Sequence, residues 1–338
     1  MHARQARNIV ELLRQRADLH PERLALRVLA DGASAESSLS YAALDQAAAA
    51  LAAELQSRLA VGDRVLLALP TGTDYVTAFL GCLYAGAIAV PAHPPESSRS
   101  QFHERLRAII EDAKPRLILT HSALVEAVAI ALSPAMTAVG AEIVAVDELR
   151  CADAGRAWQM PRLAPDAIAF LQYTSGSTST PKGVVVGHDN LIANETAIQR
   201  GFGIGDQDAF VSWLPLYHDM GLVGGLLQPL FSGIVLNLMS PRHFLERPVR
   251  WLEAIARFGG TVSGGPDFAF RLCVDRITDA MAEGLDLSSW RVAFCGAEPV
   301  RHETMQAFAE RFGGRRFNRH ALYPCYGLAE ATLLVTGG

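Results

Sequence analysis

Cysteine is scarce in this chain, and its spacing excludes two kinds of protein. The five cysteines are Cys82, Cys151, Cys273, Cys295 and Cys325, and no two of them form a CxxC pair. An odd number at wide spacing argues against a disulfide framework, and the lack of a close pair argues against a structural zinc site. Because free thiols are typical of a reducing compartment, we expect a cytoplasmic protein.

An excess of positive charge is also missing. The 338 residues include 30 lysines plus arginines and 35 aspartates plus glutamates, for a net charge of −5 at pH 7. Proteins whose main partner is nucleic acid usually carry a basic excess, so we expect no nucleic-acid partner. Hydrophobic residues make up 50% of the chain, which is too apolar for a disordered segment and sufficient for a large core.

Two stretches of the chain lack charged side chains, residues 76–95 and 221–241. At roughly 20 residues, each is long enough to cross a membrane. Both contain glycines and an internal proline, so we predict buried helices that run into buried strands, and no integral membrane segment. The first 16 residues are polar and rich in arginine, without the apolar run of a signal peptide.

Strand-like and helix-like segments alternate along the chain. Segments that are apolar throughout, such as 64–69 and 87–90, alternate with helical patterns such as 75–86 and 102–113. Strands that are apolar on both faces are typical of a parallel sheet covered by helices on both sides. We therefore predict an α/β fold of two stacked, doubly wound subdomains with mostly parallel sheets.

The weakly periodic segment 151–165 contains two prolines and is the predicted boundary between the subdomains. This places an N-terminal α/β subdomain at 1–164 and a second at 165–338. In the second, short strands at 261–263, 291–294 and 321–323 each run into a glycine- or proline-containing turn, as at a ligand crevice. The chain ends directly after a strand-like segment, so we expect it to be part of a longer protein.

Residues 174–183, Thr-Ser-Gly-Ser-Thr-Ser-Thr-Pro-Lys-Gly, form the most informative segment of the chain. Two glycines free the backbone, six hydroxyl groups and the main-chain N–H groups can donate to phosphate oxygens, and Lys182 adds positive charge. A P-loop requires a helix directly after Gly-Lys-Ser/Thr, but here Pro181 precedes Lys182 and an apolar strand follows. We therefore predict a phosphate loop between two strands. A flexible linker is the alternative, and the apolar flanks disfavour it.

This loop with its flanks, YTSGSTSTPKGVVVGHDNL, resembles the nucleotide-phosphate signature of the adenylate-forming superfamily and is most similar to that of the fatty acyl-AMP ligases. That superfamily includes acyl-CoA synthetases, peptide-synthetase adenylation domains and luciferase. Acyl-CoA synthetases usually have glycine where Ser179 stands. Further segments resemble the same family in the same order, namely PAHPP, SWLPLYHDMGLVGG, SGGPDFAFRLC, FCGAEPV and LYPCYGLAEATL.

The resemblance implies ATP-dependent activation of a fatty acid to an acyl-adenylate, with Mg²⁺ as cofactor and release of pyrophosphate. The acyl group then passes to the phosphopantetheine arm of an acyl carrier protein. A β-barrel subdomain and a C-terminal domain with a catalytic lysine follow in the family, so this chain alone is expected to be nearly inactive. An acyl-CoA synthetase, and a ligase relative that binds acyl chain or nucleotide without chemistry, remain as alternatives. Ser179 disfavours the first, and the presence of Lys182, His218 and Glu330 disfavours the second.

The resemblance also implies the residues that handle phosphate and metal. Those that hold the β- and γ-phosphates are Thr174, Ser175, Gly176, Ser177, Thr178 and Lys182, of which Thr174 and Lys182 are also catalytic. His218 lies between the fatty acid carboxylate and the α-phosphate, unless it is a core histidine satisfied by Asp219. Glu330 is a catalytic residue and the Mg²⁺ ligand, with Thr332 near the α-phosphate. A helix-dipole role is the alternative for Glu330.

The remaining implied site residues bind adenine and the acyl chain. Gly296, Ala297 and Glu298 border the adenine, Tyr326 stacks on it, and Gly327 belongs to the same nucleotide site. Simple packing is the alternative for Tyr326. The acyl tunnel wall includes Gly264, Gly265 and Phe268, where a tight turn before a helix is the alternative. The arginines at 311, 315, 316 and 319 could dock an acidic carrier protein, but positive charge near a helix C-terminus is the favoured explanation.

Overall fold

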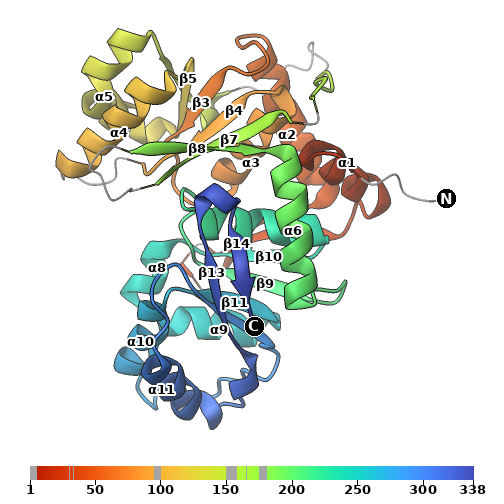
Figure 1. Cartoon of the computed structure of the whole chain (residues 1–338), viewed down its shortest axis with the longest axis vertical. Helices are drawn as coiled ribbons and strands as arrows, with labels where there is room; N and C mark the ends of the chain where they lie inside the picture. The colour runs from red at the N-terminus through yellow and green to blue at the C-terminus, as the bar shows by residue number, and fades with distance from the viewer. Residues whose placement is uncertain are drawn as a thin grey trace. The chain divides into compact units, whose positions relative to one another are not determined.

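The structure, a computed structural model, describes residues 6–29, 31–32, 34–94, 100–149, 158–164, 166–174 and 181–338 (Figure 1). The chain divides into two compact units, Met1–Glu22 with Tyr41–Ile192 and Arg23–Ser40 with Ala193–Gly338. This division differs from the predicted boundary between residues 164 and 165. The reason is strand pairing, because residues 168–187 add two strands to the sheet of the first unit and residues 24–40 add two to the sheet of the second.

The described part of the first unit contains a six-stranded sheet in the order β6-β5-β3-β4-β7-β8. Its strands are β3 (Arg64–Leu67), β4 (Ile88–Pro91), β5 (Leu117–Thr120), β6 (Glu142–Ala145), β7 (Ile168–Thr174) and β8 (Lys182–Gly187). Neighbouring strands run parallel except β8, which is antiparallel to β7. The apolar segments that predicted parallel strands therefore form them.

Helices cover both faces of this sheet. They are α1 (Ile9–Leu19), α2 (Tyr41–Gln56), α3 (Thr73–Ala85), α4 (Ser100–Ala113) and α5 (Val125–Val139). Successive residues of a strand face opposite sides. Accordingly, Phe170 of β7 packs edge to face on Phe79 of α3 at 5.8 Å between ring centroids, whereas Tyr173 joins the core beneath α4 and α5. The charge-free stretch 76–95 forms α3 and β4, as predicted.

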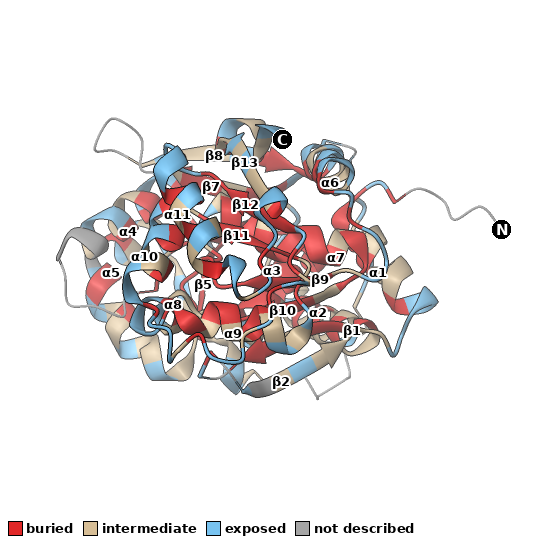
Figure 2. Cartoon of the chain, turned by 90° about the horizontal axis from the view of Figure 1, so that it is seen from below, coloured by how far each residue is buried: buried red, intermediate tan, exposed pale blue. Residues whose placement is uncertain are grey.

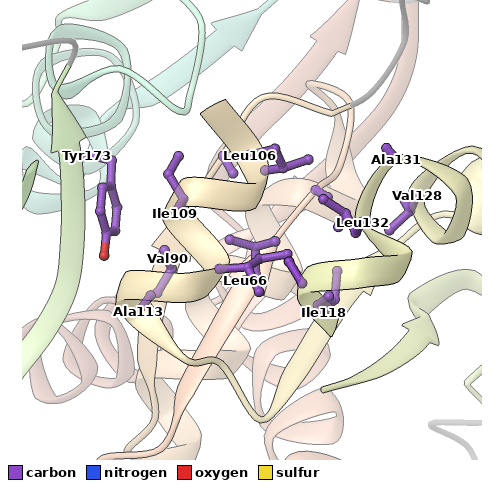
Figure 3. Packing of buried hydrophobic residues seen from close by; sticks show 14 residues of the cluster. Leu66, Val90, Leu106, Ile109, Ala113, Ile118, Val128, Ala131, Leu132 and Tyr173 are labelled. Atoms are coloured by element: carbon purple, nitrogen blue, oxygen red, sulfur yellow. The ribbon is translucent and has the colours of Figure 1, made fainter. Parts of the chain in front are cut away.

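The core between the sheet and helices α4 and α5 consists of aliphatic side chains (Figure 3). Leu66 and Val90 of the strands pack there beside Ile109 of α4 and Leu132 of α5. Each is at most 4% exposed. Burial of this apolar surface stabilises the layer that carries the β7–β8 hairpin, at about 25 cal/mol per Å².

The described part of the second unit contains an eight-stranded sheet in the order β14-β13-β12-β11-β9-β10-β1-β2. Its strands are β1 (Leu24–Leu29), β2 (Ala35–Ser40), β9 (Ala209–Ser212), β10 (Val235–Leu238), β11 (Val262–Gly265), β12 (Val292–Cys295), β13 (Leu322–Gly327) and β14 (Leu334–Gly337). The strands from β1 to β13 run parallel, and the edge strands β2 and β14 are antiparallel to their neighbours. The predicted α/β class with mostly parallel sheets is confirmed.

The helices of the second unit begin in α6 (His188–Phe202), within which the division of the chain falls. The others are the π-helix η3 (Met220–Leu227), α7 (Gln228–Ser232), α8 (Pro241–Glu246), α9 (Val249–Phe258), α10 (Asp267–Arg276) and α11 (His302–Gly313). Figure 2 shows β9, β11 and β12 as buried strands. Helix α9 ends at Gly259, which has a φ of +61° and caps the helix.

The second charge-free stretch forms the π-helix η3, helix α7 and strand β10. The glycine that follows His218 closely in the sequence predicts a turn there, and this prediction is wrong because the segment is the π-helix. Gly221 lies inside the π-helix, where an added Cβ would be 2.1 Å from the carbonyl oxygen of Pro215. No helix in the described ranges is long and apolar enough to cross a membrane.

Candidate functional site

The predicted phosphate loop is carried by the β7–β8 hairpin of the first unit. Thr174 and Lys182 are register partners and form the last pair of this ladder before the loop. Thr174 is half-buried and Lys182 is exposed. The predicted residues Ser175, Gly176, Ser177 and Thr178 lie outside the described residues. The loop therefore joins two paired strands, as the sequence analysis predicted.

A tyrosine packed on a glycine fixes the base of this loop. Tyr173 and Gly183 are register partners, and a Cβ on Gly183 would lie 2.9 Å from Cζ of the tyrosine ring. The Tyr173 hydroxyl donates to Asp112 at 2.5 Å. Burial, with Asp112 nearby, raises the pKa of Tyr173, so the phenol stays protonated and keeps this bond. Glycine is thus required after Lys182 for packing reasons alone.

The other predicted site residues lie in the second unit, at the carboxyl ends of three neighbouring parallel strands. Gly264 and Gly265 end β11, residues 296–298 follow β12, and Tyr326 with Gly327 ends β13. Because β11, β12 and β13 are adjacent and parallel, these segments meet at one edge of the sheet. Ligands of open α/β sheets bind at such an edge.

The glycines at this edge are required by contacts within the protein. A Cβ on Gly264 would lie 2.0 Å from the carbonyl oxygen of Phe294, and one on Gly265 would lie 2.7 Å from the ring of Trp213. The sequence analysis explained these glycines by close approach of an acyl chain or by a tight turn. Both are instead strand residues, and the groups that approach them are Phe294 and Trp213. Gly296 and Gly327 are similarly enclosed, by Cys325 and by the carbonyl of Leu333.

Two predicted site residues have strained backbone. Among the described non-glycine residues, only Lys114, Ala297, Arg316 and Thr332 have positive φ. Ala297 has a φ of +66°. Thr332, which is buried, has a φ of +72° and a ψ of −57°. Such conformations cost of order 1–3 kcal/mol and concentrate at functional sites, where surrounding contacts hold them.

His218 is placed at the start of the π-helix with its ring half-exposed. Its Nδ1 lies 2.7 Å from Oδ1 of Asp219, and the side chain is 53% exposed. Asp219 also accepts a hydrogen bond from the Met220 N–H at 2.7 Å and so caps the π-helix. The alternative of a core histidine satisfied by Asp219 fails on exposure, although the Asp219 contact exists. A donor Nδ1–H directed at Asp219 leaves Nε2 for other partners.

A buried acid anchors the far end of the same π-helix, and the sequence analysis missed it. Glu195 of α6 is fully buried, and burial raises its pKa well above the usual range. The Gln228 amide satisfies both neighbours when its nitrogen donates to Glu195 Oε2 at 2.5 Å and its oxygen accepts from Ser232 Oγ at 2.8 Å. Since Gln228 follows the π-helix directly, this network ties the helix that begins two residues after His218 to α6.

The β13–β14 connection presents Tyr326 and Glu330. Tyr326 is 58% exposed, so the alternative of simple packing does not account for it. Glu330 is exposed and lies in a single 3₁₀ turn, Ala329–Ala331, rather than at the start of a helix. The helix-dipole alternative for Glu330 therefore lacks its helix.

Asn194 of α6 holds this connection in place and was also missed. Its Nδ2 donates to the carbonyl oxygens of Ala331 at 3.3 Å and Leu334 at 3.0 Å. Its Oδ1 accepts from the Leu334 N–H at 3.0 Å. These three bonds bracket Thr332 and fix the backbone beside Glu330. A single Asn in the middle of a helix gave no signal for this role.

The arginine cluster pairs within its own unit. Arg311 donates to Asp279 at 2.5 Å and to the carbonyl of Ile277 at 2.8 Å, and Arg316 donates to Asp286 at 2.7 Å. These contacts favour a structural role for the arginines within their own unit over the docking of a carrier protein.

The described residues contain no group of three or more His, Cys, Asp or Glu side chains that could hold a metal ion. A single exposed carboxylate such as Glu330 nevertheless fits Mg²⁺, because this ion keeps several waters and takes phosphate oxygens as ligands.

The sequence matches the family described as AMP-binding enzyme over residues 13–337, so the chain belongs to this family. One relative is the medium-chain-fatty-acid–acyl-carrier-protein ligase JamA of Moorena producens, 44% identical over 97% of this chain and 56% of its own length. Another is the long-chain-fatty-acid–AMP ligase FadD23 of Mycobacterium tuberculosis, 38% identical over 97% of this chain and 57% of its own length.

Solved structures agree with these sequence relationships. The crystal structure of a fatty acid AMP ligase from Legionella pneumophila matches 99% of this chain with a TM-score of 0.91 and 42% identity. A fatty acyl-adenylate ligase from the same organism, in complex with acyl adenylate and pyrophosphate, matches with a TM-score of 0.90. This chain spans 57% of each of these two proteins.

Proposed function

We propose that this chain is the adenylate-binding part of a fatty acyl-AMP ligase, which activates a fatty acid with ATP and releases pyrophosphate. The observation that carries the proposal is the convergence of the implied adenine and acyl residues at the ends of β11, β12 and β13. The strained backbone at Ala297 and Thr332 supports it. The similarity to a ligase solved with acyl adenylate and pyrophosphate supports it further.

In the proposed reaction, a carboxylate oxygen of the fatty acid attacks the α-phosphorus of ATP. The bond from phosphorus to the bridging oxygen breaks, and pyrophosphate leaves with the electron pair. Negative charge builds up on the phosphates, so the site needs positive charge and N–H or O–H donors. In this proposal Lys182 and Thr174, with the loop residues 175–178, hold the β- and γ-phosphates.

We assign His218 to the contact between the fatty acid carboxylate and the α-phosphate. Asp219 orients the ring through Nδ1, at 2.7 Å. With Nδ1 facing Asp219, Nε2 is the ring nitrogen left to contact an α-phosphate oxygen. The network of Glu195 and Gln228 holds the helix that positions this ring.

The adenosine and acyl groups bind at the edge of the second sheet in this proposal. The backbone of Gly296, Ala297 and Glu298 borders adenine, and the exposed ring of Tyr326 stacks on it beside Gly327. Gly264, Gly265 and the exposed Phe268 belong to the acyl wall. Protein atoms occupy the space in which a Cβ on either glycine would lie. The two glycines therefore act by letting Phe294 and Trp213 pack against strand β11.

Mg²⁺ is the metal that Glu330 would hold, next to Thr332, because its carboxylate oxygens are exposed and hard. When bound, Mg²⁺ neutralises charge on the phosphates. The backbone that presents Glu330 is fixed by Asn194, as described above.

We further propose that an acyl carrier protein receives the acyl group, in the cytoplasm. The relative JamA is named as an acyl-carrier-protein ligase, which favours this acceptor over coenzyme A. Cys82, Cys273, Cys295 and Cys325 are free thiols, consistent with a reducing compartment. A product assay on the protein that contains this chain, with both acceptors offered, decides between them.

The proposed function is tested by calorimetry of acyl sulfamoyl-adenosines, which are non-hydrolysable acyl-adenylate analogues, in a series of acyl chain lengths. Each buried CH₂ contributes ~0.8 kcal/mol, so two carbons raise the affinity roughly fifteen-fold until the acyl site is full. We expect this steep series in the wild-type chain. Binding that does not depend on chain length, in this chain and in the protein that contains it, would contradict the proposal.

A further inference from the structure

The start of helix α11 is capped by a side chain from another helix. Arg301 is the N-cap residue of α11, and its own side chain makes no capping hydrogen bond. Instead, Oδ1 of Asp267 accepts from the Arg301 N–H at 2.8 Å. The other oxygen, Oδ2, accepts from the Thr304 hydroxyl at 3.0 Å and from the Arg301 guanidinium at 3.3 Å. Asp267 is fully buried, whereas the Arg301 side chain is exposed.

The start of α10 is capped in return from the loop that leads to α11. Pro266 is the N-cap residue of α10 and has no side chain that can accept. Glu298 supplies the missing acceptor, because its Oε1 accepts from the Phe268 N–H at 2.8 Å. Asp267 of α10 thus caps the start of α11, and Glu298 of the loop before α11 caps the start of α10. Negative groups are favourable at helix N-termini.

These reciprocal caps join two parts of the proposed site. Asp267 and Phe268 follow the acyl-wall glycines of β11, and Glu298 ends the adenine segment after β12. Phe268 is 43% exposed and meets Trp213 edge to face at 6.2 Å between ring centroids. Ala297, held at positive φ, lies directly before Glu298. A strained residue persists only when neighbouring contacts determine its conformation, and the bond from Glu298 is such a contact.

We propose that Asp267 and Glu298 are positioning residues that couple acyl binding to adenine binding. Their reciprocal caps hold Phe268 at a fixed separation from residues 296–298, so that one ligand satisfies both segments at once. Neither carboxylate needs to touch the reacting atoms. This inference rests on the function proposed above, and it adds a role for the side chains that the family resemblance did not supply.

The test compares two ligands by calorimetry, AMP and dodecanoyl sulfamoyl-adenosine, on the same chain. Glu298→Ala removes the acceptor for Phe268, and we expect it to weaken binding of the dodecanoyl analogue about tenfold and binding of AMP by a smaller factor. Glu298→Gln keeps an acceptor oxygen and restores most of the affinity. Asp267→Asn and Asp267→Ala form the corresponding pair, and the double Ala variant is expected to lose less than the product of the single losses.

Asp275→Asn is the matched control. Asp275 lies on α10, pairs with Arg271 at the surface, and takes no part in the caps. If Asp267→Ala does not fold, the exposed Glu298 pair decides the question, with folding checked by thermal melting.

The outcomes separate the inference from the proposed function. A wild-type chain that binds no dodecanoyl analogue, both alone and within the protein that contains it, contradicts the proposed function. Wild-type binding that is unchanged in Glu298→Ala overturns the coupling role. Equal losses for AMP and for the analogue overturn it as well, because Glu298 then acts on adenine alone.

Discussion

Thr174 and Lys182 face each other across the β7–β8 ladder, as the last register pair before residues 175–181. The strands on either side hold the two ends of this connection one ladder spacing apart, and Tyr173 packed on Gly183 secures the pair behind them. The Thr174 hydroxyl and the Lys182 ammonium group therefore belong to neighbouring residues at the two ends of a loop rich in Ser and Thr.

Lys182→Ala is expected to weaken ATP binding about tenfold or more, because a charge-assisted contact to phosphate is lost. Lys182→Arg keeps the charge and should recover part of the affinity. Calorimetry with ATP on this chain measures both. Lys114→Asn is the control, since Lys114 is the other lysine of the chain and its φ of +48° suits asparagine. ATP affinity equal in wild type and Lys182→Ala would rule out the assigned role.

His218→Ala is expected to lower the rate of acyl-adenylate formation about 10²–10³-fold, the usual effect of removing a donor from developing charge. Its thermal stability should stay near that of the wild type, because the ring is half-exposed. Asp219→Ala should instead lower stability by about 0.5–2 kcal/mol, because Asp219 caps the π-helix. Pyrophosphate exchange and melting of the protein that contains this chain give both quantities. A normal exchange rate in His218→Ala would refute the assignment.

Ala297→Gly is expected to leave stability unchanged or to raise it by up to about 1 kcal/mol. Glycine adopts the φ of +66° without strain, which offsets its greater freedom in the unfolded chain. Ala307→Gly in the middle of α11 is the control and should lose about 1 kcal/mol. Urea denaturation measures the two changes. Equal destabilisation of both variants would mean that Ala297 is not strained.

Glu195→Gln is expected to stabilise the chain increasingly as the pH rises. Burial raises the pKa of Glu195 in the folded state well above its unfolded value, so the acid stays protonated in the fold. At pH values below the unfolded-state pKa, Glu195 is protonated in both states and the wild type loses no stability. Above it the unfolded state ionises, and the wild type loses stability at up to about 1.4 kcal/mol per pH unit until the folded pKa is reached.

Denaturation curves of wild type and Glu195→Gln at several pH values above 5 measure this difference. Glu303→Gln serves as the control, because Glu303 is exposed on α11 and its replacement should give a difference that does not vary with pH in this way. A Glu195→Gln difference that is constant with pH would show that Glu195 is ionised in the fold.

Local pattern was sufficient to predict most elements of both sheets. The apolar segments predicted at 64–69 and 87–90 form β3 (Arg64–Leu67) and β4 (Ile88–Pro91). Helix α5 received no prediction, and it contains Pro134, a residue that normally ends a helix. The motifs that indicated the AMP-binding family were likewise contiguous runs of residues.

Features that depend on distant partners could not be predicted in this way. The pairing of β1 with β10 joins residues more than 200 positions apart and moves 23–40 into the second unit. The π-helix after His218, the buried Glu195 with Gln228, and the exchanged caps of Asp267 and Glu298 all depend on such contacts.

The physical reason lies in the range of the interactions. Helical periodicity, the apolar alternation of strands and the chemistry of a Ser/Thr-rich loop are properties of neighbouring residues, so the amino-acid order alone specifies them. Sheet membership, the exposure of His218 and the strain at Ala297 and Thr332 result from packing between segments that meet only in the folded chain. The free energy of those contacts has no local signature in the sequence.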